Sequence, residues 1–241
     1  MEMFTDNPCK RVTVPKGEKK EKDIYTLEEV AQLFQLLETA PLKYRTFFTL
    51  AIYSGFRRGE MLGLEWKDID WEHNVISVRR TSNYTASNGI YTDTTKTKKS
   101  QRSLKFPQSV MDLLREYKNE QDEERIRLGT KWVDHDRLFV KWKGEPMNNN
   151  TPYFWLKEFC EANNFRFCDI HSLRHFYASA LINEGVDAAT VSGALGHSTI
   201  TTTTSIYCHV FNQAQARASK AIASVLDFHK PNDTKGQPKA V

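Results

Sequence analysis

The sequence has only four cysteines among 241 residues, and no two of them form a C-x-x-C pair. Scattered cysteines in a chain of this size indicate reduced thiols rather than a disulfide framework. No apolar run is long enough to span a bilayer, and the first residues, MEMFTDNPCK, lack the apolar stretch of a secretory signal. From these absences we expect a cytoplasmic protein that makes no membrane contact.

The sequence also lacks a strong excess of one charge. It has 34 Lys and Arg residues and 30 Asp and Glu residues, which gives a formal net charge of +4. This balance permits a nucleic-acid partner without requiring one. The distribution of charge is more informative. Residues 96–105, KTKKSQRSLK, carry five basic residues and no acidic one, which is compatible with contact to a phosphate backbone.

The chain divides into an arm, a domain and a tail. Residues 1–23 combine two prolines and a glycine with a dense mixture of charges, which is typical of a linker. Residues 24–228 show helical and strand patterns throughout and predict a single domain. Residues 229–241 are polar, and we expect them to form a flexible tail.

Most of the domain shows the periodicity of helices. Thr26 with Glu29 three residues later forms a capping box, followed by apolar residues at helical spacing. The expected helices are 27–40, 44–56, 108–129, 151–164, 171–185, 187–197 and 212–228, and residues 58–70 predict a short helix that ends in a turn. Residues 74–81, 89–97 and 100–107 are rich in Val, Ile and Thr and predict a small antiparallel sheet, with another short strand at 137–140. The expected fold class is therefore mainly α with a small antiparallel β-sheet.

Five segments carry residue types suited to binding an anion. His171, Arg174 and His175 share one face of the predicted helix 171–185, a pattern more often found on a solvated surface than at a site. The other candidates are Arg57 and Arg58 after a glycine, Lys96, Lys98 and Lys99 in the hairpin, His197 after a helix end, and Tyr207. Each of these signals is weak when taken alone.

Taken in order, these segments resemble the motifs of the tyrosine recombinase family, which includes lambda-type phage and transposon integrases. The resemblance rests on SGFRRGE, the lysine-bearing hairpin, HSLRH, LGHST and TTTTSIYCHV. It covers residues 24–228 and implies the family's catalytic-domain fold. It also implies that residues 1–23 are the linker following an N-terminal DNA-binding domain that this chain does not contain.

The resemblance implies a site-specific recombinase that cuts and rejoins duplex DNA through a 3′-phosphotyrosyl intermediate, without metal, ATP or another cofactor. Such an enzyme would integrate or excise a mobile element. The implied nucleophile is Tyr207, the phosphate ligands are Arg57 and Arg174, the hydrogen-bonding or proton-exchanging histidines are His171 and His197, and the general acid is Lys96. Implied partners are double-stranded DNA, further protomers in a tetrameric synapse, and accessory DNA-bending proteins.

This assignment makes physical sense. A free tyrosine has a pKa of about 10, so it is a poor nucleophile at neutral pH. Two guanidinium groups favour the phenolate and offset the charge that grows on a five-coordinate phosphorus. The leaving alkoxide is strongly basic and requires an acid.

Some positions leave a choice open. Arg57 is preferred over Arg58 because the family's arginine directly follows the Gly-hydrophobic pair, here Gly55 and Phe56. Lys96 is preferred over Lys98 and Lys99 because it precedes the tight turn. Glu60 either braces Arg57 through an ion pair or is a surface glutamate. Phe176 stands where the family often has threonine, on the apolar face of its helix. His175 and His209 also fit the pattern, but as supporting groups.

Other functions remain as alternatives. A zinc hydrolase is disfavoured because Ser172 stands where its catalytic glutamate is expected, and because Arg174 between His171 and His175 opposes a cation. A catalytically silent DNA-binding module would need the basic groups but not the phenol. A type IB topoisomerase would use the same attack only to relax supercoils.

Overall fold

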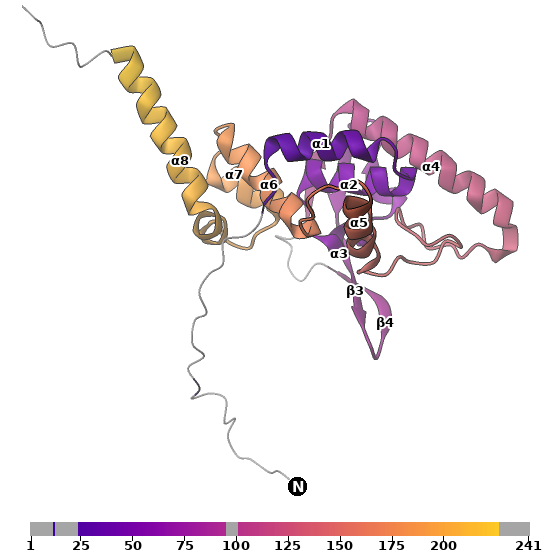
Figure 1. The fold of residues 1–241 in the computed structure, drawn as a ribbon. Coiled ribbons are helices and arrows are strands. Elements are labelled where there is room, and N and C mark those ends of the chain that lie inside the picture. Colours follow the sequence, from indigo (N-terminus) through magenta and orange to yellow (C-terminus); the bar gives the residue numbers. More distant parts are fainter. Residues whose placement is uncertain (1–11, 13–23, 95–100, 227–241) are drawn as a thin grey trace, which may run out of the picture.

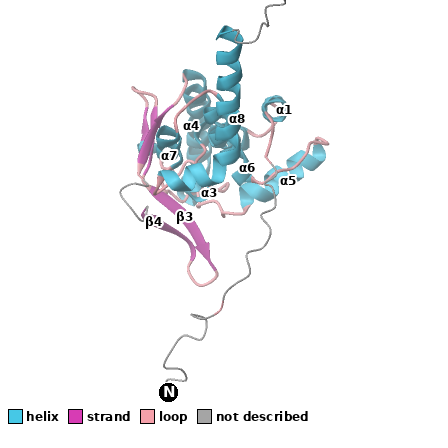
Figure 2. Cartoon of the chain, turned by 90° about the vertical axis from the view of Figure 1, so that its left-hand side faces the viewer, coloured by secondary structure: helices cyan, strands magenta, loops and turns pink. Residues whose placement is uncertain are grey.

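The computed structural model describes Val12 and residues 24–94 and 101–226. Helices make up most of this part, and the strands gather at one side of them (Figures 1 and 2). This arrangement confirms the expected fold class. The predicted arm, apart from Val12, and the predicted tail lie outside the described residues. Within the described part, no helix has the length and the apolar character needed to cross a membrane.

The helices follow the predicted order. Their bounds are α1 Leu27–Leu37, α2 Leu42–Ser54, α3 Arg58–Gly63, α4 Gln108–Leu128, α5 Thr151–Ala162, α6 Ile170–Asn183, α7 Ala188–Leu195 and α8 Ile200–Leu226, with short 3-10 turns at Trp66–Asp68 and Gly129–Lys131. At α1 the capping box is formed, since Thr26 Oγ1 accepts from the Glu29 amide and Glu29 Oε2 accepts from the Thr26 amide.

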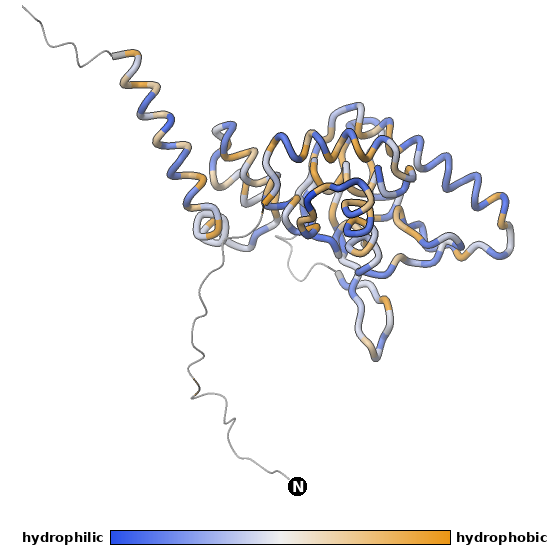
Figure 3. The backbone as a smooth tube through the Cα atoms, viewed as in Figure 1, coloured by the Kyte–Doolittle hydropathy of each residue, from blue (hydrophilic) through white to orange (hydrophobic). Residues whose placement is uncertain are grey.

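The main core surrounds α2, whose middle residues are buried on all sides. Phe47, Phe48 and Leu50 have almost no exposed surface, and they pack with Leu33 of α1 and Leu114 of α4. The outer half of α4 leaves this core and is predominantly hydrophilic (Figure 3), as its mixture of charges predicts. A smaller apolar cluster joins α6, α7 and α8 through Ala178, Ile182, Leu195, Tyr207 and Val210.

The strands form two sheets rather than the single sheet predicted. One sheet has the order β1–β2–β5, with β1 Ile69–Asp70, β2 Val75–Val78 and β5 Arg102–Lys105 paired antiparallel. The other is the hairpin of β3 Arg80–Thr85 and β4 Gly89–Thr94, which projects from the body in Figure 1. The predicted strand 74–81 is therefore broken at Arg79, because its two parts pair with different partners. The predicted strand 137–140 is wrong, since this segment forms only isolated bridges.

Two glycines allow the hairpin to lie directly against α3. A Cβ at Gly59 would lie 2.5 Å from Thr81 Oγ1, and one at Gly63 would lie 2.9 Å from the Arg80 carbonyl oxygen. Helix α3 therefore follows the hairpin backbone closely, and any side chain at these two positions would separate them.

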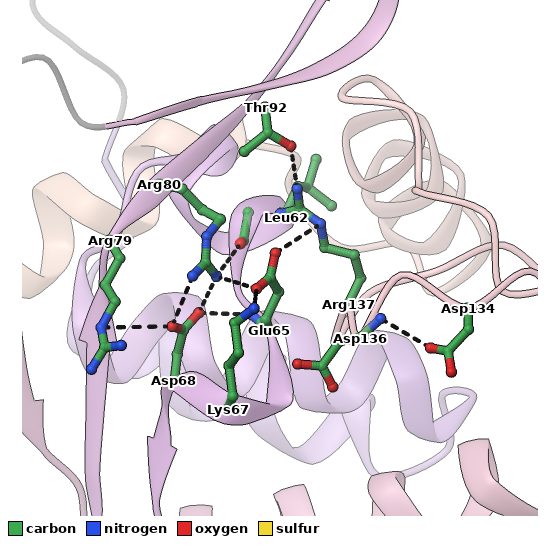
Figure 4. A network of polar contacts seen from close by, with 11 residues as sticks. Leu62, Glu65, Lys67, Asp68, Arg79, Arg80, Thr92, Asp134, Asp136 and Arg137 are labelled. Atoms are coloured by element: carbon green, nitrogen blue, oxygen red, sulfur yellow. Dashed lines mark hydrogen bonds and ion pairs between the residues drawn. The ribbon is translucent and has the colours of Figure 1, made fainter.

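The base of the hairpin is fixed by a buried charge network (Figure 4). Arg80 contacts both Asp68 carboxylate oxygens, at 2.5 and 3.3 Å, and Glu65 Oε2 at 3.0 Å. Arg137 donates to the Leu62 carbonyl and to Thr92 Oγ1 and lies 3.8 Å from Glu65. The network thus ties both hairpin strands to the segment that follows α3.

We expect Arg80→Met to destabilise the fold strongly. The Arg80 side chain is 14% exposed and that of Asp68 is 1% exposed, so the substitution leaves a buried carboxylate without its main partner. Breaking such a buried pair lowers the free energy of unfolding by about 3 kcal/mol. Arg127→Met, in the exposed pair with Glu124, should lower it by less than about 1 kcal/mol. Urea unfolding measures both, and equal costs would contradict the structural role of the network.

Candidate active site

Arg57 is placed by the turn between α2 and α3. Gly55 ends α2 with a positive φ of 57°, a conformation that glycine adopts without strain, and Phe56 is buried beside it. Arg57 then caps α3 and forms the ion pair with Glu60 considered above, with Nη1 2.9 Å from Oε1. Its Nη2 donates to the Gly196 carbonyl at 3.3 Å. Arg57 therefore faces the end of α7, 139 residues later in the chain.

Glu60 holds two arginines at once. Its carboxylate is 5% exposed and also accepts from both terminal nitrogens of Arg102, at 3.2 and 2.8 Å. Burial alone would raise the pKa of Glu60, but contact with Arg102 and Arg57 outweighs burial, so the pKa is lowered. Glu60 is consequently a buried anion that braces the arginines, not a surface residue.

Arg174 lies inside the protein rather than on a solvated helix face. It is 3% exposed, and its neighbour His175 is 4% exposed, so the solvated surface that the helix pattern alone favoured does not include these two residues. The reason is that α6 packs against α2 on one side and against α7 and α8 on the other. The Arg174 guanidinium donates to the carbonyls of Gly55 at 2.7 Å and Leu195 at 2.8 Å. Burial and the nearby Arg57 charge lower its pKa to about 9.

His197 follows directly on α7. Asp187 caps the start of this helix, and Gly196, with φ of 65°, ends it in the left-handed conformation. His197 Nδ1 lies 2.7 Å from Oγ1 of Thr203, which is fully buried in α8. Burial, followed by the charges of Arg174, Arg57 and Arg102, lowers the pKa of His197 to about 4. His197 is therefore a neutral imidazole at physiological pH.

We expect the His197 imidazole to titrate with a pKa near 4 in the folded protein. The unfolded chain binds this proton with a pKa of about 6.5, so the contribution of His197 to stability is complete above that pH. The contribution is lost as pH falls from about 6.5 toward about 4. NMR titration of the imidazole Cε1–H signal, assigned with His197→Asn, measures the value. A pKa at or above 6.5 would contradict the described electrostatics.

Tyr207 is buried within α8. The helix begins at Ile200 rather than near 212 as predicted, and the backbone at Tyr207 departs from helical geometry, with φ −108° and ψ 20°. The side chain is 1% exposed, and its hydroxyl shares a 2.8 Å hydrogen bond with His175 Nδ1. Burial raises the pKa of Tyr207 to about 12, although the charge of Arg174 opposes the rise. In this position the phenol is protonated at neutral pH.

His171 lies at the edge of this group. His171 is exposed, with its ring centroid 4.8 Å from that of His175. It lines a cavity together with Phe56, Arg58 and Asp169. Lys96 and the alternatives Lys98 and Lys99 lie outside the described residues.

The structure thus brings together Arg57, Arg174 and His197 at the end of α7. Tyr207 lies on the neighbouring helix α8, where the charge of Arg174 acts to lower its pKa. Thr203 and Arg102, which also contact this group, were not singled out from the sequence. Thr203 belongs to a run of identical residues, and Arg102 belongs to a basic segment, so neither carried a distinct signal. Among the described residues, no cluster of His, Cys, Asp and Glu could hold a metal ion.

Comparison with known proteins identifies the family of this chain. The model of the phage integrase family matches residues 24–214, which is most of the chain. The chain belongs to this family. Relatives of this chain include the ICEBs1 integrase of Bacillus subtilis, 30% identical over 94% of this chain and 60% of that protein. A XerC-like tyrosine recombinase of Caldanaerobacter subterraneus is 32% identical over 90% of this chain and 59% of that protein.

Solved structures of an integrase and of a recombinase share the fold. The Tn1549 transposon integrase in complex with a circular intermediate DNA superimposes with a TM-score of 0.70 and 21% identity, covering 86% of this chain and 68% of that one. The XerA recombinase gives a TM-score of 0.63 at 20% identity over 90% of this chain and 68% of that one. The chain has the fold of these two solved structures. It spans about 60% of the length of the two sequence relatives named above.

Proposed function

We propose that this integrase-family protein is a site-specific DNA recombinase that integrates or excises a mobile element. Its roles would be those implied by the resemblance: Tyr207 attacks a backbone phosphate, Arg57 and Arg174 bind the phosphate oxygens, His171 and His197 exchange hydrogen bonds or protons with it, and Lys96 protonates the leaving 5′ oxygen. The observation that carries the proposal is that segments 55–60, 174–175, 195–197 and 207 meet at one place. Relatives named as integrases and recombinases support it.

The chemistry follows from the charges at this place. Arg57 and Arg174 supply two guanidinium groups at the end of α7, and the charge of Arg174 also acts to lower the pKa of Tyr207. A phosphate binding between the two arginines would gain charge-assisted hydrogen bonds. Neutral His197 can accept a hydrogen bond or a proton as well as donate one. Attack by the phenol breaks the P–O5′ bond and forms a P–O–Tyr bond of similar energy. In this proposal the phenol proton passes to a neutral histidine, and the leaving 5′ oxygen takes up a proton from Lys96. The reaction can therefore be reversed by a 5′ hydroxyl without an external energy source.

Tyr207 has to change its surroundings before it reacts. A side chain that is 1% exposed offers no path for a phosphorus atom to its oxygen. The non-helical backbone at Tyr207 marks the place where α8 can adjust. DNA binding would then supply the phosphate that draws the phenol from His175 toward the arginines.

Assembly would use the end of α8, which extends away from the body in Figure 1. Between residues 212 and 225 its side chains are exposed apart from partly covered Ala214, and Ile222 and Val225 are 60% and 80% exposed. Arg217 holds the middle of this segment to Asn183 of α6. We propose that this segment docks on a neighbouring protomer in a tetrameric synapse on DNA, with accessory DNA-bending proteins, in the cytoplasm.

The proposal predicts a covalent protein–DNA adduct. A pool of nicked duplexes of randomised sequence, incubated with the protein at low salt in EDTA, should yield a product that resists denaturant and disappears on protease treatment. The nick lets the short cleaved piece diffuse away, so the adduct accumulates. Activity that stops in EDTA would instead indicate a metal-dependent nuclease. Absence of an adduct throughout the pool would contradict the proposed function.

A further inference from the structure

Three carbonyls at the end of α7, those of its last two residues and of the cap Gly196, are each bound by a different arginine. Arg102 Nε donates to the Ala194 carbonyl at 2.6 Å, Arg174 to that of Leu195 at 2.8 Å, and Arg57 to that of Gly196 at 3.3 Å. Carbonyls at a helix C-terminus have no partner within the helix and carry its negative partial charge. Three guanidinium groups from three separate elements therefore converge on this one helix end.

Two of these arginines are predicted phosphate ligands, but the third has no assigned role. Arg102 opens β5, and its side chain is 7% exposed. Its guanidinium forms a two-point contact with Glu60, which also holds Arg57, and lies 5.0 Å from the centre of the Phe56 ring. Arg102 thus bridges the segment that carries Arg57 and the helix end that carries His197.

Gly196 lies in close contact with the Arg102 guanidinium. It adopts a positive φ of 65°, and a Cβ at this position would lie 2.5 Å from Arg102 Nη1. The turn into His197 therefore passes directly over the Arg102 guanidinium. The position of that guanidinium determines where the chain leaves α7.

We propose that Arg102 is a positioning residue of the active site, which sets the geometry of Arg57 and His197 through Glu60 and the end of α7. This inference rests on the proposed function for its catalytic consequence. Arg102 does not bind the scissile phosphate in this account, since its side chain is buried and directed at Glu60 and Ala194. Its contribution is to hold two groups from distant segments in one arrangement.

Arg102→Met should slow single-turnover adduct formation by about 100-fold, because an error of about 1 Å in placing reacting groups costs that much. Arg102→Lys should slow adduct formation by about tenfold. An ammonium group keeps the charge, but it cannot bind Glu60 and the Ala194 carbonyl at the same time as the planar guanidinium does. The duplexes recovered from the randomised pool serve as substrate. Affinity for DNA and its salt dependence should stay within about twofold of the natural chain for both variants.

Arg80→Met is the matched control. Arg80 is also a largely buried arginine held by two carboxylates, and it lies in the network below the hairpin rather than at the end of α7. Each rate is measured at a temperature where all variants are folded. If Arg80→Met slows cleavage as much as Arg102→Met does, Arg102 has only a structural role and the proposal fails. A lower DNA affinity with a salt slope reduced by about one would show that Arg102 is instead a phosphate ligand, and would also overturn it.

A second measurement does not depend on activity. NMR titration of His197 should show a pKa shifted upward in Arg102→Met, because a nearby positive charge is lost and the Glu60 charge is less balanced. Arg102→Lys and Arg80→Met should leave it close to its natural value. An unchanged His197 pKa in Arg102→Met would overturn the positioning role. If the natural chain forms no adduct but this shift appears, the proposed function fails while the link between Arg102 and His197 holds.

Discussion

Tyr207→Phe should abolish the covalent adduct completely. The substitution removes only the oxygen that forms the bond to phosphorus and keeps the ring that packs with Ala178, Leu195 and Val210. Loss of the hydrogen bond to His175 should change the free energy of unfolding by about 1 kcal/mol. The protein should therefore stay folded and bind DNA while forming no adduct. Denaturing gel electrophoresis with end-labelled duplex measures the product.

Tyr177→Phe provides the matched control. Tyr177 packs against the same apolar cluster and against Gly55, and burial raises its pKa as it does that of Tyr207. If Tyr207 is the nucleophile, Tyr177→Phe should form the adduct at nearly the natural rate. An adduct that survives Tyr207→Phe would exclude Tyr207 as the attacking group.

Arg174→Lys should reduce the rate of adduct formation by about 10³-fold. One guanidinium spans the Gly55 and Leu195 carbonyls and remains charged at neutral pH despite burial. An ammonium cannot hold both carbonyls in this geometry, and burial disfavours its charged form. Loss of one preorganised hydrogen-bond donor to an oxyanion lowers the reaction rate on the order of 10²- to 10³-fold. The helix end next to His197 also loses its hydrogen bond from Arg174 to the Leu195 carbonyl. Single-turnover kinetics at saturating protein measure the loss.

The same substitution at Arg137 tests whether the loss is specific. Arg137 is also buried and donates to a backbone carbonyl, that of Leu62, and burial lowers its pKa. Arg137→Lys should lower the free energy of unfolding while the folded fraction still cleaves DNA at close to the natural rate. Equal losses from the two substitutions would indicate that Arg174 acts only through stability.

Local signals predicted most of the fold. The capping box of Thr26 and Glu29 and the apolar periods of the long helices are properties of residues close in sequence, and the structure confirms the helices that they predict. The start of α8 was missed because a run of threonines has low helix propensity, and burial of Thr203 and Tyr207 overrides it. The break at Arg79 was missed because it depends on which distant strands pair.

The order of the motifs suggested which residues would gather at the candidate site, but not the contacts that they make. The order of the motifs pointed to Arg57, Arg174, His197 and Tyr207, and the structure places these residues around the end of α7. The burial of Arg174 was mispredicted because helical periodicity on α6 shows one apolar face, whereas the helix is covered on several sides. Arg102 was missed because its partners, Glu60 and Ala194, lie 42 and 92 residues away in the chain.

The most direct test is to identify the amino acid that becomes attached to DNA. The adduct from the nicked duplex pool would be digested with nuclease and protease, and tandem mass spectrometry would locate the residue that retains the nucleotide. The account predicts a 3′-phosphate ester on the phenolic oxygen of Tyr207. Attachment at any other residue, or a nucleotide linked through its 5′ end, would contradict it.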